Sequence, residues 1–406
     1  MHHVIIGNGI SGINAAEAIR SLDSEAQITL VGDEALLPYS RPMISYVLEG
    51  SQPFEKLPIR AEGYYESFGI TPVLGRRVTR VDPDRRTVAL KNGATLTYDR
   101  LLIASGADPR TLKAEGKDLG NIFYMRTEAH VRKQLDALTG VRRALVLGGG
   151  LVGFKAAYGL LKRGIEVTLL ITSAYPLSMQ VDETAGQMIL EELVSRGLRV
   201  QVGKEVRAFK GKERVTRAVT SDGEAVDCDM VIIGKGVTPS LDFIPKDRIL
   251  ADLGILVDDH QRTSHPDIYA AGDVAQTMDI VRGRRWVNAI WPEAAAQGRV
   301  AGFNMAGRPV VYPGSLSRNV MRIFGLDVLT IGNVHTDRED GTQVLSCGGI
   351  GKGFYRRLVF KEDRLVGAVL INRIEQGGVL RALIECRRPV TFRKSALLSG
   401  AFNFKM

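Results

Sequence analysis

The sequence has few cysteines. Cys228, Cys347 and Cys386 are the only three in 406 residues, and no two of them form a C-x-x-C or C-x4-C pair. This spacing excludes a local redox disulfide and a cysteine-based metal motif. We therefore expect all three to be buried small hydrophobic residues, and the sequence predicts no metal site.

Long apolar runs are also absent. No run approaches the roughly 18 residues that a membrane-spanning helix needs. A strand begins at once with residues 4–6, which leaves no room for the charged and apolar regions of a secretion signal. We expect a cytoplasmic protein with no membrane partner.

Aromatic residues are scarce, at 6% of the sequence, whereas glycine occurs 44 times. This balance favours α/β units with tight strand-to-helix turns over a β-sandwich. With 45% hydrophobic residues, the chain is long enough to form two or three domains of roughly 100–200 residues each.

Positive charge exceeds negative charge. The formal net charge is +9, and arginine pairs occur at 284–285, 356–357 and 387–388. No nucleic-acid-binding motif accompanies them, so we expect no nucleic-acid partner. Two interpretations remain open: a positive surface for an acidic partner, or a basic surface that is only solvated.

Two glycine-rich turns of the form G-x-G-x-x-G lie at 7–12 and 148–153, each between a predicted strand and a predicted helix. In such a turn the first glycine allows the sharp bend, the second lets the backbone approach a pyrophosphate, and the third lets helix and strand pack closely. Free N–H groups at the helix N-terminus then bind phosphate. The duplication predicts two dinucleotide-binding βαβ units.

The acidic residue that accepts hydrogen bonds from a ribose is present in only one of these units. Asp33 lies 21 positions after Gly12, where that residue is expected. The corresponding stretch of the second unit, residues 171–173, has neither a carboxylate nor an arginine. The missing cation favours NAD slightly, and NADP is not excluded.

Further motifs extend the pattern across the chain: PYSRP at 38–42, LIASG at 102–106, GKGVTP at 234–239, YAAGD at 269–273, and WPE at 291–293 followed by Gln297-Gly298. Together with the two glycine turns, they resemble FAD-dependent pyridine nucleotide oxidoreductases. The group includes NADH:rubredoxin reductases, ferredoxin reductases of oxygenase systems and the flavin domain of nitrite reductases.

The resemblance implies an α/β, glutathione-reductase-like fold with two Rossmann-type dinucleotide-binding domains and an α+β C-terminal domain. The FAD-binding domain is expected at 1–112 and 242–312, the NAD(P)-binding domain at 113–241, and the C-terminal domain at 313–406.

The implied cofactors are FAD and NAD. The predicted cofactor-binding residues are Gly7, Gly9, Ile10, Ser11, Gly12, Asp33, Glu34, Arg41, Pro42, Val78, Ala104, Ser105, Gly106, Arg126, Gly148, Gly150, Leu151, Val152, Gly153, Gly236, Gly272, Asp273 and Trp291.

Two of these residues also have a reason in the sequence pattern. Asp273 follows the end of a predicted strand at 267–271, the edge at which open α/β sheets bind ligands; the alternative is a solvent-facing aspartate of a turn. Trp291 precedes Pro292, which suits the first turn of a helix at 293–305 whose positive end would face the flavin; the alternative is a core aromatic residue.

The sequence departs from several relatives in having no redox cysteine after the first glycine unit, where residues 41–48 read RPMISYVL. The second redox centre must then lie in another molecule, or dioxygen takes electrons directly. The resemblance implies exchange of electrons between NAD(H) and an iron–sulfur or rubredoxin-type partner. The chain could be the flavin subunit of a larger complex, such as an aldehyde oxidoreductase or carbon monoxide dehydrogenase. A free-standing NADH oxidase and a flavin-bearing assembly subunit remain alternatives, and a homo- or hetero-oligomer stays open.

Lys155 and Tyr46 are the predicted catalytic residues. Relatives in the ferredoxin reductase branch usually have glutamate at the position of Lys155, paired with a lysine at the position of Tyr46, and both are changed here. A cation in the first turn opposes the helix dipole by ~0.3–1 kcal/mol. We hypothesise that Lys155 points toward the flavin or nicotinamide and raises the flavin potential; the alternative is a flexible, solvated lysine.

Overall fold

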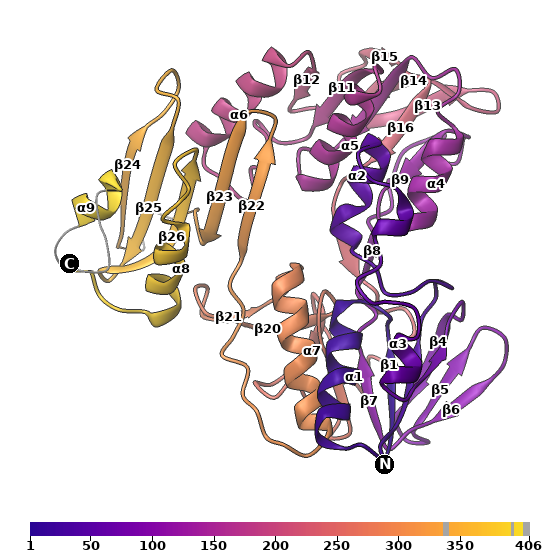
Figure 1. Cartoon of the computed structure of the whole chain (residues 1–406). Coiled ribbons are helices and arrows are strands. Elements are labelled where there is room, and N and C mark those ends of the chain that lie inside the picture. Colours follow the sequence, from indigo (N-terminus) through magenta and orange to yellow (C-terminus); the bar gives the residue numbers. More distant parts are fainter. Residues whose placement is uncertain (336–340, 391–393, 401–406) are drawn as a thin grey trace. The chain divides into compact units, whose positions relative to one another are not determined.

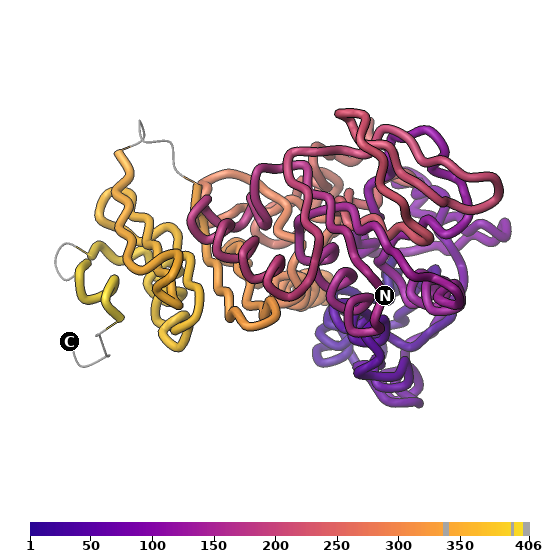
Figure 2. Tube along the Cα trace, turned by 90° about the horizontal axis from the view of Figure 1, so that it is seen from above, coloured from indigo at the N-terminus to yellow at the C-terminus, as the bar shows by residue number. Residues whose placement is uncertain are grey.

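The computed structural model describes residues 1–335, 341–390 and 394–400 (Figure 1, Figure 2). They form two compact units. The first unit contains residues 1–40, 57–108 and 238–316, and the second contains 41–56, 109–237 and the described residues from 317 onward. β8 (Ala107–Pro109) and β17 (Val237–Pro239) contain two of the points at which the chain passes from one unit to the other.

A five-stranded parallel sheet forms the centre of the first unit, in the order β19-β7-β1-β2-β3. Its strands are β1 (His2–Ile6), β2 (Gln27–Val31), β3 (Ile70–Val73), β7 (Arg100–Ile103) and β19 (Ile268–Ala270). Both faces are covered, which explains why the strands have almost continuous apolar sequences. The first predicted βαβ unit is thus confirmed.

Two helices, α1 (Ile10–Leu22) and α7 (Trp291–Met305), lie side by side in the first unit (Figure 1). Their backbones approach closely because α7 has glycine at the contacts. A Cβ at Gly298 would lie 2.1 Å from the carbonyl oxygen of Ser11, and one at Gly302 would lie 2.4 Å from that of Ala15. This packing joins segments about 280 residues apart in the sequence.

Smaller elements complete the first unit. They are α3 (Tyr64–Ser67), the antiparallel sheet β4 (Val78–Asp82), β5 (Thr87–Leu90) and β6 (Thr95–Thr97), and the sheet β18 (Ile255–Leu256), β20 (Ala275–Asp279) and β21 (Arg284–Trp286).

The second unit repeats the parallel design in the order β12-β11-β10-β16-β9. Its strands are β9 (Ile122–Tyr124), β10 (Arg143–Leu147), β11 (Glu166–Ile171), β12 (Arg199–Val202) and β16 (Met230–Ile233). The helices are α4 (Glu128–Asp136), α5 (Leu151–Lys162) and α6 (Glu183–Ser195), and an antiparallel sheet contains β13 (Val206–Gly211), β14 (Val215–Thr220) and β15 (Ala225–Asp227). The predicted duplication is therefore present.

Residues 41–56 group with the second unit, whereas the sequence predicts that they belong to the FAD-binding domain. They form η1 (Arg41–Met43), α2 (Ile44–Glu49) and η2 (Phe54–Lys56). The physical reason is that α2 packs against α4 and α5, and the Arg163 guanidinium donates to the carbonyl of Leu48. All the predicted domain limits stay predictions.

The C-terminal part of the second unit is an antiparallel sheet in the order β22-β23-β26-β25-β24 (Figure 1). Its strands are β22 (Arg318–Ile323), β23 (Leu326–Gly332), β24 (Thr342–Gly348), β25 (Tyr355–Lys361) and β26 (Arg364–Ile371), and the helices α8 (Gly377–Cys386) and α9 (Lys394–Ser399) pack on it. The Tyr355 hydroxyl donates to the Asp182 carboxylate at 2.8 Å, next to the start of α6.

Within the described residues, no helix has the length and apolar character needed to cross a membrane. The cytoplasmic location stays a prediction. The cysteine prediction was correct for Cys228, which is buried, but wrong for the other two: Cys347 is half-buried and Cys386 is exposed. Cys386 is the last residue of α8 and is not among the buried residues of that helix.

Candidate functional site

The first glycine turn joins β1 to α1. Gly7 has φ +123°, and a Cβ there would lie 2.1 Å from the Ala104 carbonyl oxygen; a Cβ at Gly12 would lie 2.0 Å from the Gly7 carbonyl oxygen. These two glycines are therefore required by the protein's own backbone. At Gly9, in contrast, an added Cβ would have no protein atom within 4 Å. Open space thus adjoins the N-terminus of α1, where a phosphate can approach.

The second turn, between β10 and α5, has the same construction. A Cβ at Gly148 would lie 2.4 Å from the Gly234 carbonyl oxygen, and one at Gly153 would lie 1.9 Å from that of Gly148. A Cβ at Gly150 would again have no neighbour within 4 Å. Gly9 and Gly150 are the N-cap residues and provide no side-chain hydrogen bond to the helix. Both turns therefore fit a dinucleotide pyrophosphate.

Predicted residues in the first helical turns follow this pattern. Ile10 in the first copy and Leu151 and Val152 in the second are half-buried. The side chain of Ser11 has another role, because its hydroxyl donates to the Ala294 carbonyl oxygen at 2.6 Å. Ser11 therefore serves the packing of α1 on α7 through its side chain.

Strand register shows which residues correspond at the ribose positions. The Gly7 N–H donates to the Val31 carbonyl, as the Gly148 N–H donates to that of Leu170. Asp33 lies two residues after Val31, and Thr172 lies two residues after Leu170, so these two positions correspond. Both side chains are exposed. The second copy therefore has a neutral hydroxyl where the first has a carboxylate.

The neighbouring positions differ in the same way. In the first copy, the Tyr39 hydroxyl donates to the Glu34 carboxylate at 2.8 Å. In the second, the Ser173 hydroxyl donates to the Tyr175 carbonyl oxygen at 2.8 Å. Neither Thr172 nor Ser173 has the charge that distinguishes NAD from NADP.

Gly272 and Asp273 follow β19, as predicted. Gly272 has φ +83°, and its N–H donates to the Gln297 side-chain oxygen at 2.8 Å. Asp273 is half-buried, and α7 begins at Trp291 with Pro292 in its first turn. Gln297 had no predicted role; the signal was its place in the quoted motif, and its function is to fix the backbone beside Asp273.

The predicted residues after β7 are also oriented by the first unit. The Ala104 N–H donates to the Ile6 carbonyl, Gly106 has φ +72°, and the Ser105 hydroxyl donates to the Ser240 carbonyl oxygen at 3.1 Å. Val78 is buried at the start of β4.

The remaining predicted residues are in the second unit. The Arg41 guanidinium donates to the Arg126 carbonyl oxygen at 3.5 Å, and Gly236 has φ +88°. Arg41, Pro42 and Arg126 therefore lie in the same compact unit as the second glycine turn. Their role in binding FAD remains a proposal.

Lys155 is not a freely solvated side chain. Its ammonium donates to the Pro42 carbonyl oxygen at 3.0 Å and lies 5.7 Å from the centre of the Tyr46 ring. Burial lowers the pKa of this ammonium from its ordinary value. The structure thus brings together the two predicted catalytic residues, with a cation–π contact in place of an ion pair.

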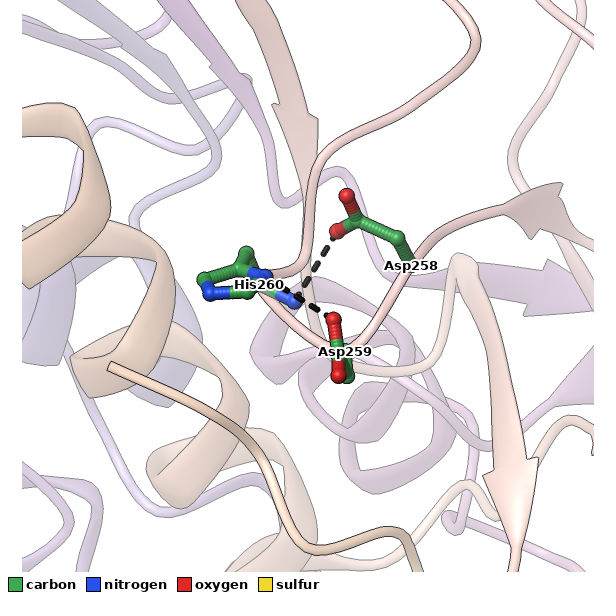
Figure 3. A group of neighbouring side chains, drawn as sticks. All are labelled: Asp258, Asp259 and His260. Carbon is green, nitrogen blue, oxygen red and sulfur yellow. Dashed lines mark hydrogen bonds and ion pairs between the residues drawn. The ribbon is translucent and has the colours of Figure 1, made fainter. Parts of the chain in front are cut away.

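A group of exposed or half-buried polar side chains, Asp258, Asp259 and His260, lies away from these turns in the sequence (Figure 3). The Asp258 carboxylate accepts N–H groups of His260 at 2.9 Å and Arg262 at 2.8 Å. The Asp259 carboxylate lies 2.8 Å from the His260 ring nitrogen Nδ1. These contacts give the group a structural role in shaping the turn.

Comparison with known families assigns both parts of the chain. Residues 1–298 match the model described as pyridine nucleotide-disulphide oxidoreductase. Residues 318–388 match the rubredoxin NAD+ reductase C-terminal domain.

Individual relatives cover nearly the whole chain. The ferredoxin reductase component of chlorobenzene dioxygenase from Cupriavidus sp. is 33% identical and matches 99% of this chain and 97% of its own length. The epsilon subunit of NADH-dependent phenylglyoxylate dehydrogenase from Aromatoleum evansii is 30% identical and matches 98% of this chain and 94% of its own length. The structure of NADH:rubredoxin oxidoreductase from Clostridium acetobutylicum is similar, with a TM-score of 0.81 and 26% identity. The match covers 98% of this chain and 99% of that one.

Other relatives are longer. The chain spans about half the length, 47%, of the assimilatory nitrate reductase electron transfer subunit and of the nitrite reductase of Bacillus subtilis.

These matches confirm the resemblance, the predicted fold class and the assignment as an oxidoreductase. FAD and NAD(H), the two predicted cofactors, are those that such proteins bind, and the two open glycine turns fit them. The chain belongs to the pyridine nucleotide-disulphide oxidoreductase family.

Proposed function

We propose that this chain is an FAD-dependent NAD(P)H oxidoreductase that exchanges electrons with an iron–sulfur or rubredoxin-type protein. The observation that carries the proposal is the pair of open glycine turns in a chain whose α2 segment contains no thiol. The names of the relatives support it, because one is a ferredoxin reductase component and a similar structure is an NADH:rubredoxin oxidoreductase.

The first unit holds FAD in this proposal. The N–H groups at the start of α1 bind the pyrophosphate, Asp33 accepts hydrogen bonds from a ribose, and Asp273 binds the ribityl region. Bound FAD supplies the change from two-electron to one-electron chemistry. The chain's own contribution is positioning, for which Gln297 fixes Gly272 at 2.8 Å.

The second unit binds the pyridine nucleotide through the turn at Gly150. Thr172 and Ser173 present no carboxylate that would repel a 2′-phosphate. The backbone N–H of Lys204 donates to the Ile171 carbonyl oxygen, and the side-chain ammonium of Lys204 is paired with the Asp222 carboxylate at 2.8 Å and also with that of Glu224. Because Thr172 and Ser173 are neutral and Lys204 is paired with carboxylates, NADH is the expected substrate and NADPH a weaker one.

The protein's thiols do not supply a second redox centre in this scheme. Burial raises the pKa of Cys228 to about 12, so its thiol stays protonated. Cys347 and Cys386 belong to the C-terminal sheet and α8, and not to α2. The electron acceptor therefore lies in another molecule.

A finer proposal is that the chain works as the flavin subunit of a larger redox complex. Its support is the 30% identity with the epsilon subunit of phenylglyoxylate dehydrogenase over nearly the full length of both proteins. Purification of the native protein from its source, with partners identified by mass, tests this: a stoichiometric iron–sulfur subunit supports it, and elution as the single chain contradicts it.

The main proposal is tested by anaerobic titration of the purified protein. Addition of NADH should bleach the visible flavin absorbance, and subsequent addition of oxidised rubredoxin or a [2Fe–2S] ferredoxin should restore it. If NADH does not bleach the flavin absorbance, the proposed function is contradicted. Rapid NADH-dependent oxygen consumption with no transfer to either protein would instead support the NADH oxidase.

A further inference from the structure

In the sequence, the hairpin of β20 and β21 lies between Asp273 and Trp291, two predicted FAD-binding residues. β20 begins two residues after Asp273, and β21 ends five residues before Trp291. Thr277 of β20 pairs with Trp286 of β21. Since Thr277 is four residues from Asp273, at most about 14 Å of chain separates these two positions.

A buried carboxylate fixes the turn of this hairpin. Asp279 is fully buried and accepts the N–H groups of Val281 at 2.9 Å and Arg282 at 2.8 Å. Its other oxygen accepts the Arg282 guanidinium and the Asn288 amide, both at 2.8 Å. Asn288 lies in the segment that leads into α7, so its bond to Asp279 ties the turn to that segment. Asn288 also donates to Ser315, which follows α7, at 2.7 Å.

The hairpin combines arginine side chains with an aromatic ring. The guanidinium groups of Arg282 and Arg284 lie 5.3 and 5.1 Å from the centre of the Trp286 ring. Arg284 and Arg285 are exposed, and Arg285 pairs across the strands with Met278, which is 47% exposed. Among the described residues, neither Arg284 nor Arg285 forms an ion pair. Because side chains alternate along a strand, Arg284 and Trp286 lie on one face of the edge strand β21, and Arg285 with Met278 on the other. We call these four residues and Arg282, which together surround the edge strand, the hairpin surface.

The side chains of Arg356 and Arg357, in contrast, contact other parts of the protein and are not available to bind a partner. Arg356 is 6% exposed, and its guanidinium donates to the carbonyl oxygens of Leu397 at 2.9 Å and Arg373 at 3.3 Å. Arg357 lies 3.8 Å from the Asp182 carboxylate. These two arginines therefore stabilise the second unit and do not form an open positive surface.

The pair Arg387-Arg388 is exposed but lies at the end of α8, in the second unit. The hairpin surface is in the same unit as Asp273 and Trp291. Exposure and place in the chain thus distinguish the three arginine pairs that look equivalent in the sequence.

We propose that the hairpin surface is the docking site for a small acidic iron–sulfur electron carrier; this inference rests on the proposed function. Unpaired guanidinium groups bind carboxylates in bidentate geometry, and Trp, Met and Arg are enriched in the centres of protein interfaces. The net charge of +9 steers a negatively charged partner toward the protein. Fixation of the turn by Asp279 lowers the ordering cost of binding.

The test compares two double variants with the same change in charge. Arg284→Glu/Arg285→Glu alters the hairpin surface, and Arg387→Glu/Arg388→Glu alters the other exposed pair. With NADH as reductant and an acidic [2Fe–2S] ferredoxin or rubredoxin as acceptor, the hairpin variant should raise KM for the carrier about tenfold or more, with little change in kcat. The control should stay within about twofold of wild type.

Ionic strength provides a second readout that loss of structure would not imitate. The KM of the wild type should rise steeply with salt, whereas the hairpin variant should show a much shallower dependence. Arg284→Lys/Arg285→Lys, which keeps both charges, should restore most of the salt dependence.

Two results would overturn the inference: an unchanged KM in the hairpin variant, or an equal rise in the control. If the Glu variant does not retain flavin, Arg284→Gln/Arg285→Gln is measured instead, with a rise of about threefold expected and an unchanged KM again contradicting the proposal. A wild type that reduces neither carrier would instead contradict the proposed function itself.

Discussion

The Lys155 ammonium donates a 3.0 Å hydrogen bond to the Pro42 carbonyl oxygen while it lies over the Tyr46 ring. This contact joins Lys155, the fifth residue of α5, to η1, so the position of the cation is fixed by two elements of the second unit. The dipole of α5 disfavours a cation near this end by at most ~0.3–1 kcal/mol, and the Pro42 carbonyl dipole offsets that cost.

Lys155→Glu should lower the flavin reduction potential and slow flavin reduction by NADH, while FAD stays bound. The reason is that a negative charge replaces a positive one at the position that we propose faces the cofactors. Potentiometric titration of the visible spectrum measures this, with Lys155→Arg as the control that keeps the charge. An unchanged potential in Lys155→Glu would limit the lysine to linking α5 and η1.

Gly150→Ala should weaken NADH binding by about tenfold or more without loss of FAD or of thermal stability. A Cβ at Gly150 would have no protein atom within 4 Å, so the protein can accommodate it, but it would occupy the space for the pyrophosphate. Fluorescence titration gives Kd. Gly153→Ala is the contrasting variant, because its Cβ would lie 1.9 Å from a carbonyl oxygen and should lower Tm instead. Unaltered NADH affinity in Gly150→Ala would refute the assignment of this turn.

Alkylation of the accessible thiols should leave NADH-to-acceptor activity intact. Cys386 is exposed and Cys347 half-buried, so at most two adducts should form, whereas buried Cys228 keeps a protonated thiol. Mass spectrometry counts the adducts, and circular dichroism controls for unfolding. A large loss of activity in the folded, alkylated protein would mean that a thiol participates in electron transfer.

Acidification should destabilise the first unit through His3. Burial lowers the pKa of this histidine from 6.5 to about 4, so between these values the unfolded chain binds the proton and the folded chain does not. The free energy of unfolding should therefore decrease by about 3 kcal/mol as the pH falls from 6.5 to 4. Urea denaturation at several pH values measures it. His3→Asn should flatten this part of the pH dependence, and an identical profile for the variant would contradict the assignment.

The sequence was sufficient for features that depend on local pattern. Each βαβ unit could be predicted because apolar strands, glycine turns and helices follow one another within about 30 residues, and Pro292 identifies the start of α7. Features that depend on distant packing could not be predicted. Residues 41–56 contact α4 and α5, which lie about 80 to 120 residues away in the chain, so no local pattern assigns them to the second unit.

The arginine pairs show the same limit. Arg356 and Arg357 are adjacent in the sequence, but the register of β25 places Arg356 under the described part of the C-terminal segment, against the Leu397 carbonyl. Arg284 and Arg285 are adjacent in the same way, yet lie on an edge strand and remain exposed. Composition identifies the excess of charge, and only the fold identifies which part of it is accessible.

The packing of α1 on α7 determines the order in which the chain can fold during synthesis. The sheet of the first unit needs β19, and α1 needs the glycines of α7, so this core cannot be complete before about residue 305 has left the ribosome. Residues 109–237 contain the whole parallel sheet of the second unit, from β9 to β16. The nucleotide unit encoded second can therefore fold first, while the amino-terminal strands and α1 wait for their partners.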